Sequence, residues 1–353
     1  MAHHPSLSWT ALSALGLICG AVARAPAQQA ADTASPRTEP LFESSERLVL
    51  NFTADFGALA KDRGTEKHDY PGVLSFVSPS GDSVTLNVKV HTRGHYRLKI
   101  CQYPPLKIDF DTAQVAGTVF AHQKSLKLVG QCRGGHTYEN YLLEEQLIYR
   151  SYNLLTDLSF RVRLAQITYL DAKQKHGPDT RWAFFLQDDD RMAKRTRKTV
   201  FAHPVNQAET DPTQMGLFAV FQYMIGNTDW AVSALHNVVL IWDSSGVMYP
   251  VPYDFDWSGV IWPPYAMPDP SLNLRTVRER TFRNAECFTP ETLARVFARF
   301  NAQKDTIYAL YRGQEGLEPK RVKQALDYYD DFYRTINDAR GARRAFIDGC
   351  ANR

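Results

Sequence analysis

The sequence predicts an α+β fold in which a β-rich N-terminal half is followed by a mainly helical C-terminal half. Two observations predict it. The first half contains "SVTLNVKV", where apolar and polar residues alternate as in a half-buried strand. The second half opens with "TQMGLFAVFQYMIGN", an apolar helix that ends at Gly226 and Asn227, which are typical helix-ending residues. A chain of 353 residues is long enough for one large domain or two modest ones.

The strands of the first half are predicted from alternation and from turn residues. Val84, Leu86, Val88 and Val90 fall on one face of the strand at 83–92. Gly81-Asp82 forms the turn to a strand at 72–77. Further strands are expected in "PLKIDF", in "SLKLVG" and as a hairpin at 160–170 and 181–187.

A helix is predicted at about 137–154, with Thr137 as its N-cap. Its apolar stripe includes Glu145 but not Glu144. A carboxylate on a buried face needs a partner, although Glu145 at the stripe edge could also reach solvent. The run "QDDDRMAKRTRK" is interpreted as a solvated loop and hinge between the halves. Helices are also expected at about 289–301, 303–312 and 319–337.

The N-terminus is interpreted as a cleaved secretory signal at 1–27, followed by a linker at 28–44. The β-rich lobe then covers 45–190, and the helical lobe covers 191–353. We therefore expect an exported protein that is periplasmic, extracellular or associated with the cell envelope. Once the signal is removed, the sequence predicts no integral membrane segment.

Cysteine usage agrees with export. Cleavage leaves Cys101, Cys132, Cys287 and Cys350, an even number that favours disulfides. Their order suggests Cys101–Cys132 and Cys287–Cys350, although four cysteines permit three connectivities. A zinc site is less favoured, because the sequence has no CxxC pair. The net charge of +3 gives no argument for binding nucleic acid.

The stretch "HNVVLIWDSSGVMYPVPYDFDW" concentrates polar residues among apolar ones. Two short strands flank an Asp-Ser-Ser-Gly turn, with Asn237 before the first strand and Asp254 and Asp256 after the second. A hairpin brings these ends together, and Asp229 lies in the loop just before. Amide and carboxylate oxygens suit Mg²⁺ or Mn²⁺ rather than Zn²⁺. Alternatively, these residues cap turns or are simply solvated.

This order of residues is that of a phosphoryl-transfer site, in which a loop carrying a base precedes an Asn ligand, a hairpin and an Asp ligand. The ordinary protein-kinase signature is absent. Asp229 and Asn237 are 8 residues apart, which is longer than HRDxxxxN, and Asp254-Phe255-Asp256 replaces Asp-Phe-Gly. The only glycine-bearing candidate for a phosphate loop is "TRGHYR" at 92–97.

Five segments carry a family resemblance over roughly residues 80–262: "VKVHTRGHYR", "PPLKIDF", "SLKLVG", "WAFFLQDDDRMAKR" and "GNTDW…HNVVLI…PVPYDFDW". Together they resemble the spore-coat CotH family of atypical, secreted protein-kinase-like proteins. The resemblance implies a bilobal protein-kinase-like fold, with a β-rich N-lobe and a mainly helical C-lobe. It also implies that ATP or another nucleotide is bound with Mg²⁺ or Mn²⁺.

The resemblance also implies roles for individual residues. Asp229 would be the catalytic base, and Asn237 and Asp254 would bind the metal, with Asp256 as a candidate third ligand. Glu145 would pair with a strand lysine that touches the nucleotide phosphates.

Lys127 is the favoured lysine, because it lies 18 residues before Glu145, a natural gap between a strand and a helix. Lys107 is the other candidate. Arg93 is a further candidate for a phosphate contact, and each lysine could instead be an ordinary surface residue.

Three functions remain open from the sequence. The first is a phosphotransferase that modifies Ser or Thr on an exported or envelope protein. The second is a pseudokinase or a structural envelope protein that only binds. The third is a metal-dependent phosphoester hydrolase.

Overall fold

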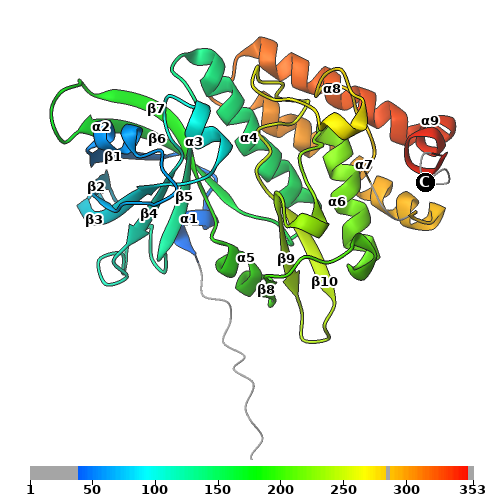
Figure 1. Cartoon of the computed structure of the whole chain (residues 1–353), viewed down its shortest axis with the longest axis horizontal. Helices are drawn as coiled ribbons and strands as arrows, with labels where there is room; N and C mark the ends of the chain where they lie inside the picture. The colour runs from blue at the N-terminus through cyan, green and yellow to red at the C-terminus, as the bar shows by residue number, and fades with distance from the viewer. Residues whose placement is uncertain (1–38, 284–286, 349–353) are drawn as a thin grey trace, which may run out of the picture. The chain divides into compact units, whose positions relative to one another are not determined.

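Seven strands close into a barrel in the computed structural model, which describes residues 39–283 and 287–348 (Figure 1). The order around the barrel is β1-β2-β3-β4-β5-β7-β6. Neighbours are antiparallel except β1 and β6, which are parallel and close the barrel. The strands are β1 (Leu48–Ala54), β2 (Tyr70–Val77), β3 (Ser83–Thr92), β4 (Leu106–Phe110), β5 (Ser125–Gly130), β6 (Val162–Asp171) and β7 (Asp179–Leu186).

The barrel interior is filled by one alternating set of side chains from each strand, as strand geometry requires. Leu86, Val88 and Val90 of β3 are buried there, which confirms the predicted alternation. Phe120 contributes an aromatic contact to Phe185 from β7. The barrel is therefore a packed core of its own.

The remaining elements are mostly helical. The helices are α1 (Pro40–Glu43), α2 (Phe56–Lys61), α3 (Tyr96–Ile100), α4 (His136–Leu155), α5 (Asp189–Arg195), α6 (Pro212–Ile225), α7 (Pro290–Arg312), α8 (Pro319–Asn337) and α9 (Ala339–Arg343). A three-stranded sheet joins β8 (Thr199–Phe201), β9 (Val238–Trp242) and β10 (Met248–Pro252). Within the described residues, no helix combines the length and the apolar content that crossing a membrane requires.

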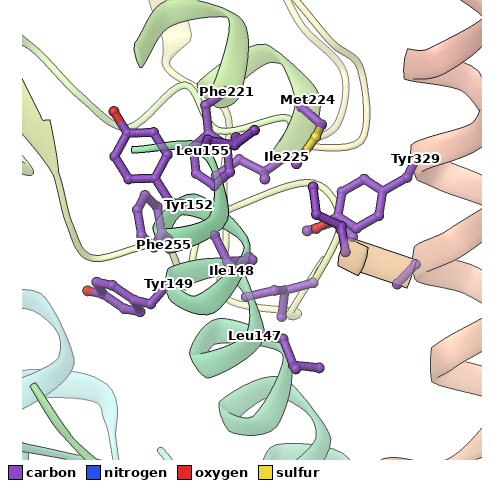
Figure 2. Close-up of a cluster of buried hydrophobic side chains, with 14 of the residues drawn as sticks. Leu147, Ile148, Tyr149, Tyr152, Leu155, Phe221, Met224, Ile225, Phe255 and Tyr329 are labelled. Carbon is purple, nitrogen blue, oxygen red and sulfur yellow. The ribbon is translucent and has the colours of Figure 1, made fainter. Parts of the chain in front are cut away.

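Helix α4 joins the barrel to the other helices. It contacts β6 and β7 on one side and α7 on another, and residues 142–149 are all buried. Figure 2 shows Tyr149 and Tyr152 of α4 packed with Phe221 of α6 and with Phe255. The second core is therefore built around this helix.

The predicted bilobal protein-kinase-like fold is wrong, although the α+β composition is correct. The N-terminal strands close into a mixed barrel through the parallel pairing of β1 with β6. In β7, Ala183 and Phe185 face the barrel core, whereas Phe184 and Leu186 belong to the helical core. The two predicted lobes thus share a strand that is buried on both faces.

Other expectations about local structure were confirmed. The strands of the predicted hairpin at 160–170 and 181–187 are β6 and β7, and the helix at 319–337 is α8. Gly226 ends α6 in the left-handed conformation, as a glycine cap should. Cys101 and Cys132 form the expected disulfide. The signal at 1–27 and the residue Cys350 of the second expected disulfide lie outside the described residues.

Four local predictions were wrong for identifiable reasons. The charged run forms α5, because the Asp188 side chain caps its first turn. The helices at 289–301 and 303–312 are one helix, α7. Helix α4 begins at His136 after Gly135, without the Thr137 cap. The last linker residues form α1, whose Leu41 and Phe42 are buried.

Candidate functional site

The β9–β10 hairpin brings Asn237 and Asp254 together, as the sequence predicted. Val238 is paired with Pro252, and the next residue, Tyr253, donates its backbone N–H to the Asn237 carbonyl at 3.1 Å. Asn237 and Asp254 have φ of 53° and 60°, which are unusual for residues other than glycine and are common at functional sites.

Asp229 lies beside Asn237 in the loop after α6. The Asn237 Nδ2 group donates to the Asp229 Oδ2 at 2.9 Å and to the Asp229 carbonyl at 2.8 Å. The Nε2 atom of His236 lies 2.7 Å from the Asp229 Oδ1. Because its nitrogen is used in this way, the Asn237 amide keeps its Oδ1 oxygen as the available ligand atom.

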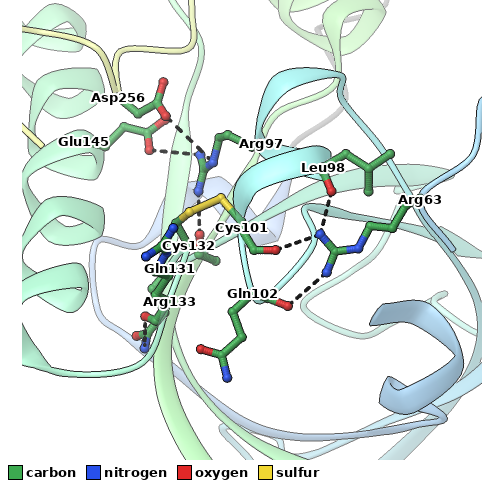
Figure 3. The surroundings of a disulfide bond; sticks show 11 residues. Arg63, Arg97, Leu98, Cys101, Gln102, Gln131, Cys132, Arg133, Glu145 and Asp256 are labelled. Atoms are coloured by element: carbon green, nitrogen blue, oxygen red, sulfur yellow. Dashed lines mark hydrogen bonds and ion pairs between the residues drawn. A yellow bond between two sulfur atoms is a disulfide. The ribbon is translucent and has the colours of Figure 1, made fainter. Parts of the chain in front are cut away.

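The Arg97 guanidinium faces the carboxylates of both Glu145 and Asp256, as Figure 3 shows. Its Nη1 is 3.6 Å from Glu145 and its Nε is 3.8 Å from Asp256. Its Nη2 donates to the Gly130 carbonyl at 2.7 Å. Both carboxylates are nearly buried, at 3% and 7% exposure, so this arginine is the charge partner that the Glu145 prediction required.

The Cys101–Cys132 disulfide holds the segment that carries Arg97. Helix α3 ends directly before Cys101, and Cys132 follows closely after β5. The bond therefore ties the helix that presents Arg97 to the strand end that supplies the Gly130 carbonyl (Figure 3).

The electrostatics of this group are unusual. Burial and the neighbouring Asp254 carboxylate raise the pKa of Asp256 to about 7, although Arg97 acts in the opposite direction. Burial also raises the pKa of Glu145 well above its ordinary value. Burial lowers the pKa of Arg93, and the charge of Asp254 opposes that change. Perturbed groups gathered in this way are typical of functional sites.

The oxygen atoms of this group fit a hard divalent cation. The Asp256 Oδ2 is buried and has no hydrogen-bond donor among the described residues. The charges of Asp254 and, to a smaller extent, of Asp229 both raise the pKa of Asp256. Asn237, Asp254 and Asp256 would hold Mg²⁺ or Mn²⁺. A cation there would coordinate the Asp256 oxygen, which has no hydrogen-bond donor among the described residues although Arg97 lies 3.8 Å away.

The predicted lysine contact differs from the structure. Lys127 pairs with Asp189 at 2.9 Å instead of with Glu145, and its Nζ lies 5.0 Å from the centre of the Tyr253 ring. Lys107 is on the outer face of β4, directly paired with His91 and Lys127 on the neighbouring strands. Lys127 thus lies next to the residue that precedes Asp254, whereas Lys107 lies one strand further away.

Sequence reasoning missed Arg97, Glu144 and Tyr149. Arg97 is the last residue of the "TRGHYR" segment. A basic residue at the end of a candidate phosphate loop was the sequence signal that could have identified it as a site residue. Glu144 is fully buried and paired with Arg321 of α8, since α4 is surrounded on all sides. The hydroxyl of Tyr149 accepts the Asp254 backbone N–H at 2.8 Å, and only the tertiary fold brings these residues together.

A second acidic group lies on the outside of the barrel. Asp69, His91 and Asp109 place one ligand atom each within 4.8 Å of one another. The His91 Nδ1 is 3.5 Å from Asp69 and 3.6 Å from Asp109. Lys89 approaches Asp69 at 3.6 Å and already supplies positive charge, so we assign this group no function.

No family model and no curated protein matches this chain. The resemblance to the CotH family thus rests on the quoted motifs alone. The function has to be argued from the geometry of the Asp229, Asn237, Asp254 and Asp256 group and from the two arginines beside it.

Proposed function

We propose that the chain is a CotH-like phosphotransferase that moves the γ-phosphate of a metal-bound nucleotide to a Ser or Thr hydroxyl of an exported or envelope protein. The observation that carries the proposal is that Asn237 contacts Asp229, that Asp254 and Asp256 follow the paired strand of the same hairpin, and that Arg93 and Arg97 carry charge close to these two carboxylates. Oxygen ligands on one side and guanidinium groups on the other are the elements that a metal-bound phosphate requires.

Each residue has a distinct role in this proposal. The Asp229 side chain is 31% exposed, so it can reach a substrate, and it would accept the proton of the substrate hydroxyl. Asn237, Asp254 and Asp256 would hold the cation, which neutralises negative charge on the phosphates. Arg93 would contact the phosphates directly, because Arg97 is already occupied by Glu145 and Asp256.

The proposal of an exported substrate depends on the predicted export of the chain itself. The disulfide of Cys101 and Cys132 is a bond that persists in oxidising compartments. A protein substrate in the same compartment would meet the site after both have been secreted. The nucleotide would be ATP, or another nucleotide that is present outside the cytoplasm.

The test measures binding and transfer separately. The melting temperature of the wild-type protein should rise when ATP is added together with Mn²⁺ or Mg²⁺, because a ligand that binds only the folded state stabilises it. Asp254→Ala should abolish this rise. Asp229→Ala should keep the rise and lose transfer of labelled γ-phosphate to a Ser/Thr-containing protein. Asp243→Asn is the control, since this residue caps the turn at the far end of the same hairpin.

The outcomes also separate the alternatives. If the melting temperature of the wild-type protein does not change when metal and ATP are added, the proposal is wrong. Binding without any loss of γ-phosphate would identify a pseudokinase. Release of inorganic phosphate without labelled protein would identify a hydrolase. The contact between His236 and Asp229 favours this alternative, because a His–Asp pair can take a proton from water.

A further inference from the structure

A pocket of about 180 Å³ lies where α1 and α4 pack on the start of β6. Phe42 and Leu164, each 7% exposed, give it part of an apolar lining. The rest of the lining is mostly polar and includes two arginines, Arg150 and Arg161. The volume is below the range that is usual for drug-sized ligands, so the pocket suits a small ligand.

Arg150 enters this pocket without a charge partner. Gln146, Arg150 and Asn153 are spaced by four and three residues, so they share one side of α4, and all three line the pocket. Arg150 is half-buried, yet its guanidinium makes no hydrogen bond, ion pair or ring contact with the described residues. Burial lowers its pKa, and no carboxylate opposes that change. A guanidinium has five N–H donors, and a charge removed from water usually has a partner.

Arg161 brings a second guanidinium of the same kind. Its backbone is paired with Gln187 in both directions, but its side chain contacts no partner within the part of the chain that the structure describes. Arg195 is close by, because burial and then the charge of Arg161 lower the pKa of Arg195 to about 10. Arg195 itself donates to the carbonyls of Asp157 and Ser159. It therefore adds positive charge near the pocket while its own donors are in use.

Little negative charge offsets these arginines. Glu43 is the one carboxylate among the described residues that line the pocket, and it is exposed to solvent, which screens its charge. The α1 side of the pocket is held by Arg163, whose Nη1 donates to the Ser44 carbonyl at 2.7 Å and to the Leu41 carbonyl at 3.2 Å. The pocket is thus formed by the fold itself and carries an excess of positive charge.

We propose that this pocket binds a small tetrahedral oxyanion with two negative charges, such as phosphate or sulfate, through the guanidinium groups of Arg150 and Arg161. A guanidinium can donate two parallel hydrogen bonds to two oxygens of such an anion. The pocket shares no residue with the Asp229, Asn237, Asp254 and Asp256 group, so the inference does not depend on the proposed phosphotransferase function.

The ligand class is tested by isothermal titration calorimetry of the full chain at constant ionic strength and about pH 8. EDTA in the buffer removes divalent cations, which could otherwise hold an anion at the Asp254 site. Sulfate and phosphate should each saturate one site with a dissociation constant of about 1 mM or below. Acetate, with a single charge, should bind at least about tenfold more weakly. Binding of O-phosphoserine as well would assign a terminal phosphate group as the ligand, and its failure to bind would assign the free ion.

Variants locate the binding. Arg150→Met and Arg161→Met should each weaken sulfate binding at least about tenfold, because each removes one charged donor pair. Arg150→Lys keeps the charge and loses the fork, so its affinity should lie between those of Arg150→Met and the wild-type protein. Arg340→Met is the matched control, since Arg340 is exposed and is not among the residues that line the pocket. Asp254→Ala should bind sulfate as the wild-type protein does.

Weaker binding in Arg150→Met or Arg161→Met, with both controls unchanged and all variants folded by circular dichroism, supports the proposal. No saturable binding of sulfate to the wild-type protein up to about 10 mM would overturn it. So would acetate binding as tight as sulfate binding, an equal loss in Arg340→Met or Asp254→Ala, or binding that both pocket variants leave unchanged. If Arg150→Met proves unfolded, Arg161→Met alone decides between these outcomes.

Discussion

The Arg97 guanidinium lies 3.6 Å from Glu145 and 3.8 Å from Asp256, and it is the charge that lets both buried carboxylates exist in this fold. These distances are too long for hydrogen bonds, so the contact is electrostatic. Burial disfavours the charge of Arg97, yet Asp256, Tyr265 and Glu145 together raise its pKa. The arginine of "TRGHYR" thus connects the barrel to α4 and to the loop after β10.

Removal of Arg97 is predicted to destabilise the protein strongly. Arg97→Met leaves Glu145 and Asp256 without their cation, and breaking a buried charge group of this kind costs about 3 kcal/mol. The free energy of unfolding, measured with urea, checks this value. Adding Glu145→Gln should restore part of the loss. Arg334→Met is the control, because Arg334 pairs with Asp331 on the exposed surface; an equal effect of both arginines would contradict the prediction.

The Cys101–Cys132 disulfide is predicted to contribute about 3–4 kcal/mol to stability. Its cysteines are 31 residues apart, and closing a loop of that length restricts the unfolded chain by about this amount in the chain-entropy model. The double variant Cys101→Ser, Cys132→Ser should lower the free energy of unfolding accordingly. A loss below about 1 kcal/mol would mean that the α3 segment is held by other contacts, such as those of Arg63 with the carbonyls of Leu98 and Cys101.

Stability without metal is predicted to fall as the pH rises from about 4 to about 7. The folded-state pKa of Asp256 is raised to about 7, so in this window the folded protein keeps a proton that the unfolded chain has lost. Asp256 alone then makes folding less favourable by about 1 kcal/mol per pH unit, and its contribution ends above pH 7. The raised pKa of Glu145 adds to the slope in the same direction. Urea unfolding in EDTA at several pH values measures this slope.

Asp256→Asn is the corresponding variant, because its amide cannot lose a proton. It should reduce the pH dependence between about 4 and 7, with Glu145 supplying the remainder through its own raised pKa, and it should raise stability at the upper end of that window. A variant with the same slope as the wild-type protein would show that another group causes the dependence. Added Mg²⁺ should stabilise the wild-type protein more at pH 8 than at pH 5, since a cation binds the ionised carboxylate.

The variant Lys127→Met tests whether Lys127 only supports the fold or also binds the nucleotide. Its pair with Asp189 is partly exposed, at 23% and 38%, so its loss should lower stability by less than about 1 kcal/mol. If Lys127 also contacts the nucleotide, Lys127→Met should weaken ATP binding at least about tenfold. Asp189→Asn breaks the same pair and should leave ATP binding intact. Equal effects of both variants would remove Lys127 from the nucleotide site.

Local patterns were sufficient for most secondary structure. Alternation and turn residues identified six of the seven barrel strands but not β1. Glycine and turn residues identified the end of α6 and the hairpin of β9 and β10. Two residues close in the sequence are constrained by the geometry of the elements between them. The meeting of Asn237 with Asp254 follows from that rule, because the ends of a two-stranded hairpin have to be neighbours.

The predictions that failed depended on contacts between distant segments. Glu144 was left off the predicted apolar stripe of α4, but it is buried against Arg321, which comes from α8. Lys127 was matched to Glu145 by spacing along the chain, whereas Asp189 reaches it from α5. Spacing fixes which residues share a face of one element, and it carries no information about which other element covers that face.

The sequence by itself determined six of the seven barrel strands, the main helices and the local convergence of Asn237 and Asp254, and it favoured the Cys101–Cys132 pairing among three connectivities. Only the tertiary structure decided that β1 pairs in parallel with β6 to close a barrel, and that Arg97 is the partner of Glu145. The physical reason is that the closure of a barrel and the pairing of buried charges depend on the burial and the charge balance of the whole fold. A local sequence pattern contains no information about either.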